Sequence, residues 1–365
     1  MQEATFYHRT EDGHVQCELC PRRCTLAAGS TGFCRTRENH AGTLYTLVYG
    51  KPCTIRMTRP ENAPLYHFLP GHKRLALATV GCNLRCRYCQ NWTLSQATPG
   101  DAPSETLLPQ DVVDLALRQG AQSISFTYTE PTVFYEYAYD ISYLAQQRGL
   151  YTSIVTNGYI NPAPLRRLLQ VMDAVKVDLK GFTASFYRQI CTATLAPVLT
   201  SLQRVRAAGV HLEIVYLVVP EHNDDPQALR AMCEWIAEHL GTGVPLHLTR
   251  FFPHYELTSL PPTPIRALER ARRIALDAGL AYIYLGNVHD HIANDTYCHN
   301  CDTPLVRRTG FAVLENHVID GRCPSCGQRI PGIWASAGPV TSWLPAAYSG
   351  QRGTRPWTRA VGDTQ

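Results

Sequence analysis

Three cysteines stand close together at Cys82, Cys86 and Cys89, with C-x3-C-x2-C spacing. They follow an apolar run at 75–80 that predicts a strand, so we expect them on the loop at that strand's C-terminal end. A cubane iron–sulfur cluster has four irons, and three thiolates would leave one iron open for a small molecule. The spacing therefore predicts a cluster with an open iron. A buried or zinc-bound cysteine group is the alternative, although no nearby fourth Cys or His completes such a set.

A second group lies near the C-terminus, where Cys298 and Cys301 form one pair and Cys323 and Cys326 form another. The spacing between the pairs is close to that of a zinc ribbon, in which each pair makes a tight knuckle. Residues 306–318 are expected to supply the intervening strands. We expect four thiolates to hold a structural zinc here.

A third group, Cys17, Cys20, Cys24 and Cys34, has C-x2-C-x3-C-x9-C spacing. Four thiols in so short a segment predict one metal. The spacing matches neither the bacterial nor the plant-type ferredoxin pattern, and a structural zinc needs only a tetrahedron of soft ligands. Zinc, a second iron–sulfur cluster and no metal at all stay open for this group.

The composition is that of an ordinary globular protein, with 365 residues of which 45% are hydrophobic and 18% are charged. The formal net charge of +4 requires neither a nucleic acid nor an anionic membrane as partner, and a small substrate is equally compatible. No leader peptide and no run of about 18 apolar residues is found. We expect a cytoplasmic, metal-binding protein without a membrane partner, and a nucleic acid stays open. The remaining cysteines are expected to be buried structural thiols, namely Cys53, Cys191 and Cys233.

Strand and helix patterns alternate after the cysteine loop. This alternation predicts a parallel α/β sheet, either doubly wound or an open barrel, with the active site at the C-terminal ends of the strands. The expected strands are 123–127, 152–155, 174–179, 212–219, 246–249 and 282–285, and the expected helices are 109–118, 165–172, 198–208, 227–240 and 265–278. An earlier strand is expected at 43–49, followed by an irregular, proline-containing approach.

The chain is expected to divide into four parts. These are an N-terminal Cys-rich segment with a lead-in (1–72), a barrel-like α/β unit (73–290), a zinc-ribbon-like module (291–336) and a mobile tail (337–365). The tail is expected to be mobile because it contains many Gly, Pro, Ser and Thr residues and little periodicity.

The cysteine loop, with Tyr88 directly before its last cysteine, resembles the signature of radical S-adenosylmethionine (SAM) enzymes. The resemblance implies a partial (β/α)6 barrel and a [4Fe–4S] cluster whose open iron binds SAM. In that superfamily the reduced cluster cleaves SAM to a 5′-deoxyadenosyl radical, which abstracts hydrogen from the substrate. A flavodoxin- or ferredoxin-like protein is then the expected reductant.

The resemblance also implies SAM contacts at the strand ends. Glu130 stands where the superfamily often has the Glu of a Gly-Gly-Glu motif, and is expected to be the strongest single contact. In activating enzymes of pyruvate formate-lyase, the Asp that matches Asp178 helps to bind a monovalent cation near SAM; here a structural ion pair with Lys180 is the alternative. Arg250 is expected either to pair with a carboxylate or phosphate or to stabilise the barrel rim. The full set of expected cofactor contacts is Tyr88, Tyr128, Thr129, Glu130, Thr156, Asn157, Gly158, Asp178, Lys180 and Arg250. For the Thr-Asn-Gly sequence at 156–158, a plain turn is the alternative.

Six motifs resemble those of AmmeMemoRadiSam-system radical SAM proteins, across about residues 15–335. They lie at 20–21 (CP), 32–34 (GFC), 66–71 (YHFLPG), 126–132, 285–288 (LGNV) and 323–334. That family takes its name from the occurrence of its genes together with those of a Memo-type and an AMMECR-type protein. The resemblance therefore implies these two proteins as partners.

Two other functions are kept beside this one. The first is activation of a glycyl radical enzyme. Against it, Val155 stands where activases have an Asp, Val215 where they have an Arg, and His254 is shifted by one place. The second is an RNA- or protein-binding adaptor with two zinc modules and a vestigial barrel, which the near-neutral charge and the intact cysteine loop disfavour.

Overall fold

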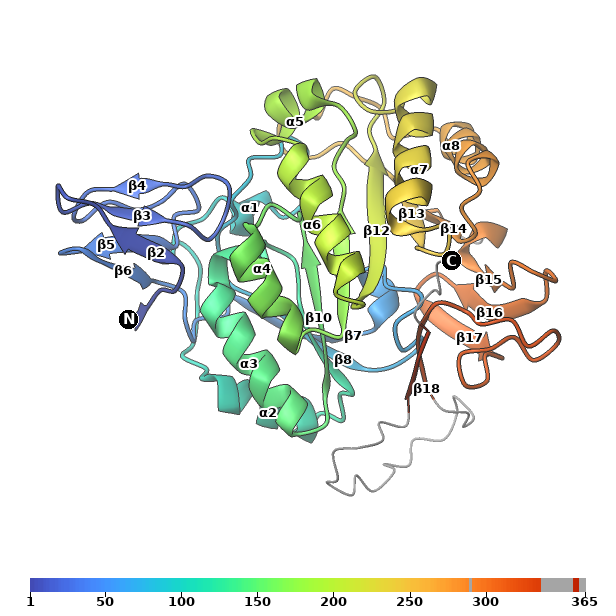
Figure 1. Ribbon diagram of the computed structural model, residues 1–365, viewed down its shortest axis with the longest axis horizontal. Coiled ribbons are helices and arrows are strands. Elements are labelled where there is room, and N and C mark those ends of the chain that lie inside the picture. Colours follow the sequence, from blue (N-terminus) through green and yellow to red (C-terminus); the bar gives the residue numbers. More distant parts are fainter. Residues whose placement is uncertain (289–290, 336–356, 361–365) are drawn as a thin grey trace.

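The computed structural model describes residues 1–288, 291–335 and 357–360, and its centre is an eight-stranded sheet (Figure 1). Seven strands, β8 to β14, are parallel, and β7 is added antiparallel at one edge. The strands are β7 (Thr54–Thr58), β8 (Arg74–Ala78), β9 (Ser123–Phe126), β10 (Tyr151–Thr156), β11 (Ala174–Asp178), β12 (His211–Val218), β13 (Leu246–Arg250) and β14 (Ile283–Gly286).

The strand order decides between the two expected windings. Each parallel strand lies beside its predecessor in the chain, in the order β14-β13-β12-β11-β10-β9-β8-β7. A doubly wound sheet would reverse its order partway, whereas a barrel-type sheet adds strands in one direction. The expected parallel α/β sheet is confirmed with the barrel-type order. It has seven parallel strands where the resemblance implied six, because β14 continues the series, and β7 lies in the stretch expected to be irregular.

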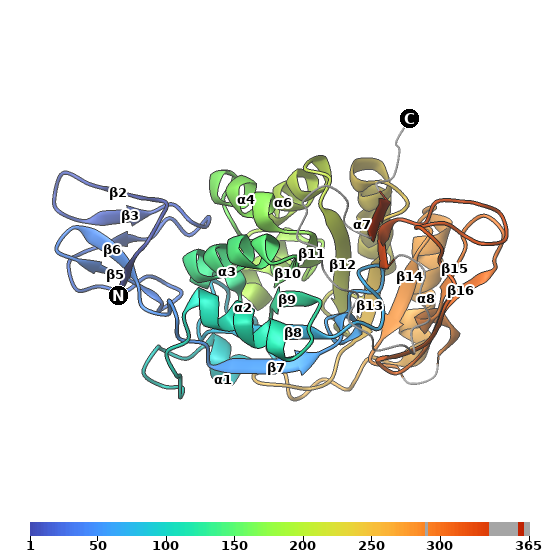
Figure 2. The same cartoon turned by 90° about the horizontal axis from the view of Figure 1, so that it is seen from below.

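The helices follow one another around the sheet (Figure 2). They are α1 (Trp92–Ser95), α2 (Pro109–Arg118), α3 (Tyr135–Gln147), α4 (Pro162–Leu168), α5 (Ala184–Cys191), α6 (Ala196–Ala207), α7 (Pro226–Leu240) and α8 (Ile265–Asp277). The N-terminus of α7 illustrates the residues that begin a helix in this chain. Its first residue is Pro226, and the side chain of Asp225 accepts a 2.8 Å hydrogen bond from the backbone N–H of Ala228.

The sequence prediction missed α1, α3 and α5. Helix α3 is rich in tyrosine, a residue more typical of strands, whereas α1 and α5 are short, with four and eight residues. The five expected helices are present, with ends that differ by a few residues. Within the described ranges, we find no helix that combines the length and apolar character needed to cross a membrane.

Two small antiparallel sheets precede the main sheet and lie at the opposite end of the molecule from β15 to β17 (Figures 1 and 2). A buried ion pair joins them to α3, with 2.6 Å between the Arg37 guanidinium and the Glu136 carboxylate. The backbone N–H of Thr5 donates to the same carboxylate. Their strands are β1 (Gln2–Glu3), β2 (Tyr7–Arg9), β3 (Val15–Cys17), β4 (Thr25–Leu26), β5 (Arg37–His40) and β6 (Thr43–Thr46).

The C-terminal part has its own sheet and hydrophobic core. Strands β15 (Thr296–Tyr297), β16 (Pro304–Thr309) and β17 (Ala312–Asn316) form the sheet, and β18 (Gly332–Ala335) pairs with β19 (Trp357–Ala360). The Arg308 guanidinium donates a 2.9 Å hydrogen bond to the carbonyl of Tyr66, which fastens this part to the lead-in. The core includes Tyr66, Tyr282, Tyr284, Leu305, Val306 and Trp334. The tail expected at 337–365 lies outside the described residues apart from β19, and the four expected part boundaries stay a prediction.

A buried polar network around Glu213 lies near the N-terminal end of β12. Its carboxylate accepts hydrogen bonds from the backbone N–H groups of Tyr66 (2.9 Å) and His67 (2.8 Å). The imidazoles of His211 and His247 also hydrogen-bond to it, at 2.9 and 2.7 Å. Burial raises the pKa of Glu213, but these two imidazoles hold it well below its usual range.

Candidate active site

The cysteine loop leaves β8 at its C-terminal end, as expected, and runs into α1. Its tight path requires Gly81, which has φ +97°. A Cβ at this position would lie 2.4 Å from Thr36 Cγ2 and 2.8 Å from the carbonyl oxygen of Cys34. The loop is thus packed directly against the N-terminal Cys-rich segment. The other side of the loop rests on α5, where the carbonyl of Cys191 accepts from the backbone N–H of Arg85 at 3.1 Å.

The three thiols of the loop lie near one another and are buried or half-buried. Cys86 is buried, and Cys82 and Cys89 are half-buried. The Cys82 sulfur accepts from the backbone N–H of Leu84 at 3.4 Å, and the Cys89 sulfur lies 3.3 Å from Ser95 Oγ. Burial raises the pKa of both thiols, so metal binding here would release protons. Among the described residues, these three sulfurs are not a group whose ligand atoms all lie within 4.8 Å of one another. This wider spacing fits a cluster in which each thiolate binds its own iron better than it fits a single ion.

Cys191 is a neighbour that the sequence prediction did not place here. It is buried, as expected for a structural thiol, and its sulfur lies 3.9 Å from the Tyr88 hydroxyl. A hydrogen bond with the Cys191 thiol, together with burial, raises the pKa of Cys86 well above its usual value. No spacing rule links Cys191 to the loop, because α5 brings it there.

Glu130 joins the C-terminal ends of β9 and β10. It is buried, and one carboxylate oxygen accepts from the Thr156 hydroxyl at 2.7 Å and from the Thr132 hydroxyl at 2.6 Å. The other oxygen accepts from the backbone N–H of Asn157 at 2.8 Å. Burial raises the pKa of Glu130, and these hydrogen bonds oppose the rise. Both oxygens thus hold neighbouring protein groups, which makes Glu130 an organiser of the strand ends. Its expected direct contact with SAM stays a prediction.

Asn157 connects this carboxylate to the cysteine loop. Its side-chain nitrogen donates to Asn83 Oδ1 at 2.9 Å and lies 3.8 Å from the Cys82 sulfur. Gly158 follows with φ +71°, and its missing side chain lets Val177 and Val198 pack closely. The structure therefore brings the expected Thr-Asn-Gly turn, Glu130 and the cysteine loop together.

Asp178 lies between two lysines. Its two carboxylate oxygens lie 2.5 Å from the Lys176 ammonium and 2.8 Å from the Lys180 ammonium. Burial raises the pKa of Asp178, but the two positive charges lower it to about 2. Lys180 also interacts electrostatically with Cys86, so the triad lies beside the cysteine loop. The ion pair kept as an alternative is thus present, with Lys176 as a further partner that the sequence prediction missed.

Two aromatic side chains stack beside the loop. Trp92, the first residue of α1, is 42% exposed and stacks on Tyr255 with 5.0 Å between the ring centroids. The two residues lie far apart in the sequence, so only the fold pairs them. Arg250 Nε donates to the carbonyl of Thr263 at 2.8 Å, which holds the rim of the sheet.

The other two expected contacts lie between β9 and the loop. The carbonyl of Tyr128 accepts from the Asn91 side chain at 2.7 Å, and the Thr129 hydroxyl donates to the carbonyl of Thr79, also at 2.7 Å. Tyr128 has φ +66°, the left-handed conformation of a sharp turn. Both residues thus shape the backbone next to the cysteine loop.

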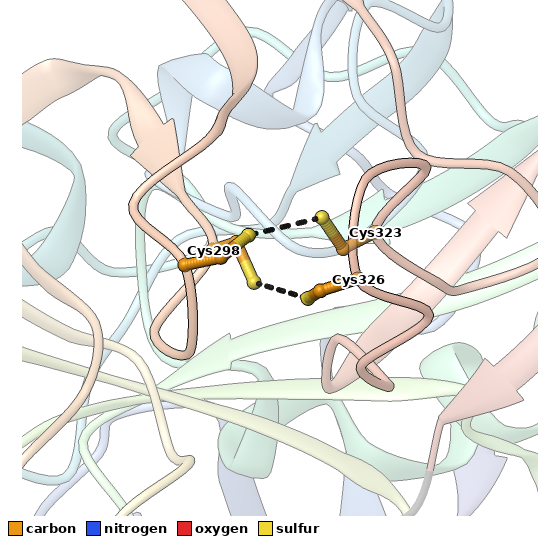
Figure 3. A group of neighbouring side chains, drawn as sticks. Cys298, Cys323 and Cys326 are labelled. Atoms are coloured by element: carbon orange, nitrogen blue, oxygen red, sulfur yellow. Dashed lines mark hydrogen bonds between the residues drawn. The ribbon is translucent and has the colours of Figure 1, made fainter.

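The C-terminal cysteines form a compact group (Figure 3). The Cys298 and Cys326 sulfurs are 3.6 Å apart, and those of Cys301 and Cys323 are 3.7 Å apart. All four sulfurs lie within 4.8 Å of one another. The group fits a metal-binding module, as expected from its spacing.

A three-cysteine loop lies at the C-terminal end of the first parallel strand. The sequence comparisons agree with the enzyme class that this arrangement indicates. Residues 77–233 match the family model described as "Radical SAM superfamily". The chain belongs to this superfamily and is an enzyme.

Its relatives differ in how much of the chain they share. Uncharacterized protein MJ0808 of Methanocaldococcus jannaschii is 43% identical over 332 residues, which cover 90% of this chain and 99% of the relative. The pyruvate formate-lyase-activating enzyme of Listeria monocytogenes is 25% identical over 178 residues, covering 45% of this chain and 69% of that enzyme. Among solved structures, a domain of the activating enzyme from Bacteroides vulgatus has a TM-score of 0.41 and 18% identity, and the match covers 46% of this chain and all of that domain.

Proposed function

We propose that this enzyme holds a [4Fe–4S] cluster on Cys82, Cys86 and Cys89, binds SAM beside it, and abstracts hydrogen from its substrate. The observation that carries the proposal is the position of the three-thiol loop: Asn157 lies 3.8 Å from the Cys82 sulfur, Glu130 holds Asn157, and the Lys180 partner of Asp178 interacts electrostatically with Cys86. When bound, the cluster and SAM supply a 5′-deoxyadenosyl radical by reductive cleavage of SAM.

The protein's own residues position SAM and exclude water in this proposal. Glu130 keeps the Asn157 turn in place, and in this proposal the turn lies beside the ribose of SAM. The Lys176 and Lys180 ammonium groups pair with both carboxylate oxygens of Asp178, the residue whose counterpart in activating enzymes helps to bind a monovalent cation. We therefore infer that these ammonium groups supply the positive charge there, and that no added cation is needed.

We also propose that the C-terminal group holds zinc. Sulfurs around one zinc at about 2.3 Å from the metal are roughly 3.8 Å apart in a tetrahedron, close to the two distances found here. The hydrophobic core around the small sheet is limited and partly supplied by Tyr66, Tyr282 and Tyr284 from outside it, so a metal would contribute to its folding. The Memo-type and AMMECR-type partners, and a flavodoxin- or ferredoxin-like reductant, belong to this proposal as consequences of the resemblance.

The proposal is tested by anaerobic reconstitution followed by a SAM-cleavage assay. We expect release of 5′-deoxyadenosine that depends on a reductant and is lost in the Cys82→Ala/Cys86→Ala/Cys89→Ala variant. Cys233→Ala, at a buried thiol in α7, is the matched control and should keep cleavage. Cleavage that persists in the triple variant would refute the assignment of these ligands.

Activation of a glycyl radical enzyme is the second candidate, because the 25%-identical relatives include pyruvate formate-lyase-activating enzymes. One feature of the sheet argues against it. Val215 is the register partner of Asp178 on β12, where activases carry an Arg, so the charge environment of this Asp differs from theirs. A glycyl radical signal after incubation with a glycyl radical enzyme would favour activation, and its absence beside active SAM cleavage would favour a different substrate.

A further inference from the structure

The four N-terminal cysteines line one cleft. Cys17, Cys20, Cys24 and Cys34 all face it, and its apolar wall includes Phe33 and Val133. A Cβ at Gly32 would lie 3.8 Å from both the Cys24 and the Cys34 sulfur, so this glycine leaves the space between those two ligands open. The four cysteines therefore line one shared cleft, although they lie far apart in the chain from the Asn83 and Val133 side chains that complete it.

The C-terminal group provides a comparison within the same chain. There all four sulfurs lie within 4.8 Å of one another, which is what a single ion requires. Across the described ranges, the N-terminal cysteines are not among the groups brought together in this way. In a cubane each thiolate binds a different iron, so the sulfurs must stand farther apart than around one zinc. The wider placement of the N-terminal sulfurs thus favours a cluster over zinc.

Hydrogen-bond donors reach the sulfurs of this cleft. The Thr36 hydroxyl donates to the Cys34 sulfur at 3.3 Å. Burial raises the pKa of the Cys20 thiol, and the backbone N–H of Arg22 and the Asn83 side chain oppose this rise. Hydrogen bonds to cysteine sulfurs are one of the means by which proteins tune the potential of iron–sulfur clusters.

The cleft shares a wall with the three-cysteine loop. Asn83 lines the cleft and is the residue next to Cys82 in the chain. Its carbonyl accepts from Arg22 Nε at 3.0 Å. The Phe33 ring lies between the guanidinium groups of Arg22 (3.8 Å) and Arg85 (4.1 Å), and Arg85 belongs to the loop. A group bound in the cleft would therefore stand next to the proposed SAM site.

We propose that Cys17, Cys20, Cys24 and Cys34 hold a second [4Fe–4S] cluster, which carries single electrons to the site at the three-cysteine loop. Four thiolates ligate all four irons, so this cluster has no open iron for SAM or substrate, and electron transfer is the chemistry left to it. It accepts one electron from the flavodoxin- or ferredoxin-like reductant and gives one up to the loop site, and no bond forms or breaks. The electron-carrying role depends on the proposed radical SAM function, whereas the cluster site itself does not.

Metal content tests the site without relying on activity. After anaerobic reconstitution of the full chain, we expect about eight irons in the wild type and about four, with equal sulfide, in the Cys82→Ala/Cys86→Ala/Cys89→Ala variant. The remaining iron should give the electron paramagnetic resonance signal of a reduced [4Fe–4S] cluster that SAM does not change. An iron-free triple variant that carries zinc beyond the C-terminal site would overturn the proposal. The Cys53→Ala/Cys233→Ala variant is the control and should keep all of its iron.

The reciprocal variant, Cys17→Ser/Cys20→Ser/Cys24→Ser/Cys34→Ser, tests the electron-carrying role and gives a second measurement if the triple variant does not fold. It should lose about half of the iron yet keep the SAM-induced change in the remaining cluster signal. Cleavage driven by the protein reductant should be lost, while cleavage driven by dithionite is retained. Equal cleavage with both reductants would overturn the electron-carrying role. A wild type that holds both clusters but never cleaves SAM would instead refute the proposed function and leave the second cluster in place.

Discussion

The backbone N–H of Asn157 donates a 2.8 Å hydrogen bond to the Glu130 carboxylate, and this bond ties the end of β10 to the end of β9. The same asparagine reaches Asn83 with its side chain at 2.9 Å. One buried carboxylate thus controls the position of a turn that touches the cysteine loop. This connection relates the stability of the strand ends to the geometry of the proposed SAM site.

Glu130→Gln should weaken SAM binding without unfolding the protein. An amide keeps one acceptor oxygen but places an NH2 group against donors of Thr132, Thr156 or Asn157, at a cost of about 1 to 3 kcal/mol. Equilibrium dialysis with SAM and urea unfolding measure the two effects. Glu105→Gln, at an exposed position, is the control. Unchanged SAM affinity in Glu130→Gln would remove Glu130 from the proposed site.

Asp178→Asn should destabilise the protein most above about pH 4. The folded-state pKa of Asp178 is lowered to about 2, from an ordinary value of 3.8. A carboxylate with a lowered pKa stabilises the fold above its unfolded pKa, and this contribution is lost as the pH falls through the folded value. The shift corresponds to about 2 kcal/mol.

Urea unfolding of the wild type and the Asn variant between pH 6 and 2 checks this expectation. The stability difference between them should shrink as the pH falls from about 4 to about 2. Asp277→Asn, at an exposed position in α8, is the control for a change in net charge. A difference that stays constant over this range would show that the Lys176 and Lys180 pairs do not stabilise the fold through the Asp178 charge.

The Cys301→Ser/Cys326→Ser variant should lose about one zinc per chain and melt at a lower temperature. Both side chains are exposed, so these changes leave the buried core around Trp334 intact. Zinc analysis and a thermal melt make the measurement, with Cys53→Ser as the control. A zinc content equal to that of the wild type would exclude this group as the zinc site.

Gly158→Ala should destabilise the protein more than Gly209→Ala does. Both glycines have positive φ, +71° and +65°, so each alanine costs about 1 to 2 kcal/mol in backbone strain. Only at Gly158 would the new Cβ also meet neighbours, at 3.1 Å from Val177 Cγ1 and 3.2 Å from Val198 Cγ1. Urea unfolding compares the two variants directly. Equal losses of unfolding free energy in the two variants would mean that Val177 and Val198 move aside at little cost.

Local patterns in the sequence were sufficient for the parallel α/β layout. The helices at Pro109–Arg118 and Pro226–Leu240 lie close to the expected positions because apolar spacing, an initial proline and a closing glycine act within one segment. The tyrosine-rich helix Tyr135–Gln147 was missed for the opposite reason. Its Glu136 is buried against Arg37, a residue about a hundred positions earlier, and no local pattern reveals that partner.

By itself, the sequence determined which thiols belong together, since ligand spacing within a short loop is a local property, and it placed the three-cysteine loop at a strand end. Only the tertiary structure decided the barrel-type strand order, the contact of Cys191 with Cys86, the Lys176 partner of Asp178, and the difference between a compact and an open cysteine group. The physical reason is distance along the chain. Each of these relationships joins groups from different elements or depends on how side chains fill space, and both are set when the whole core packs.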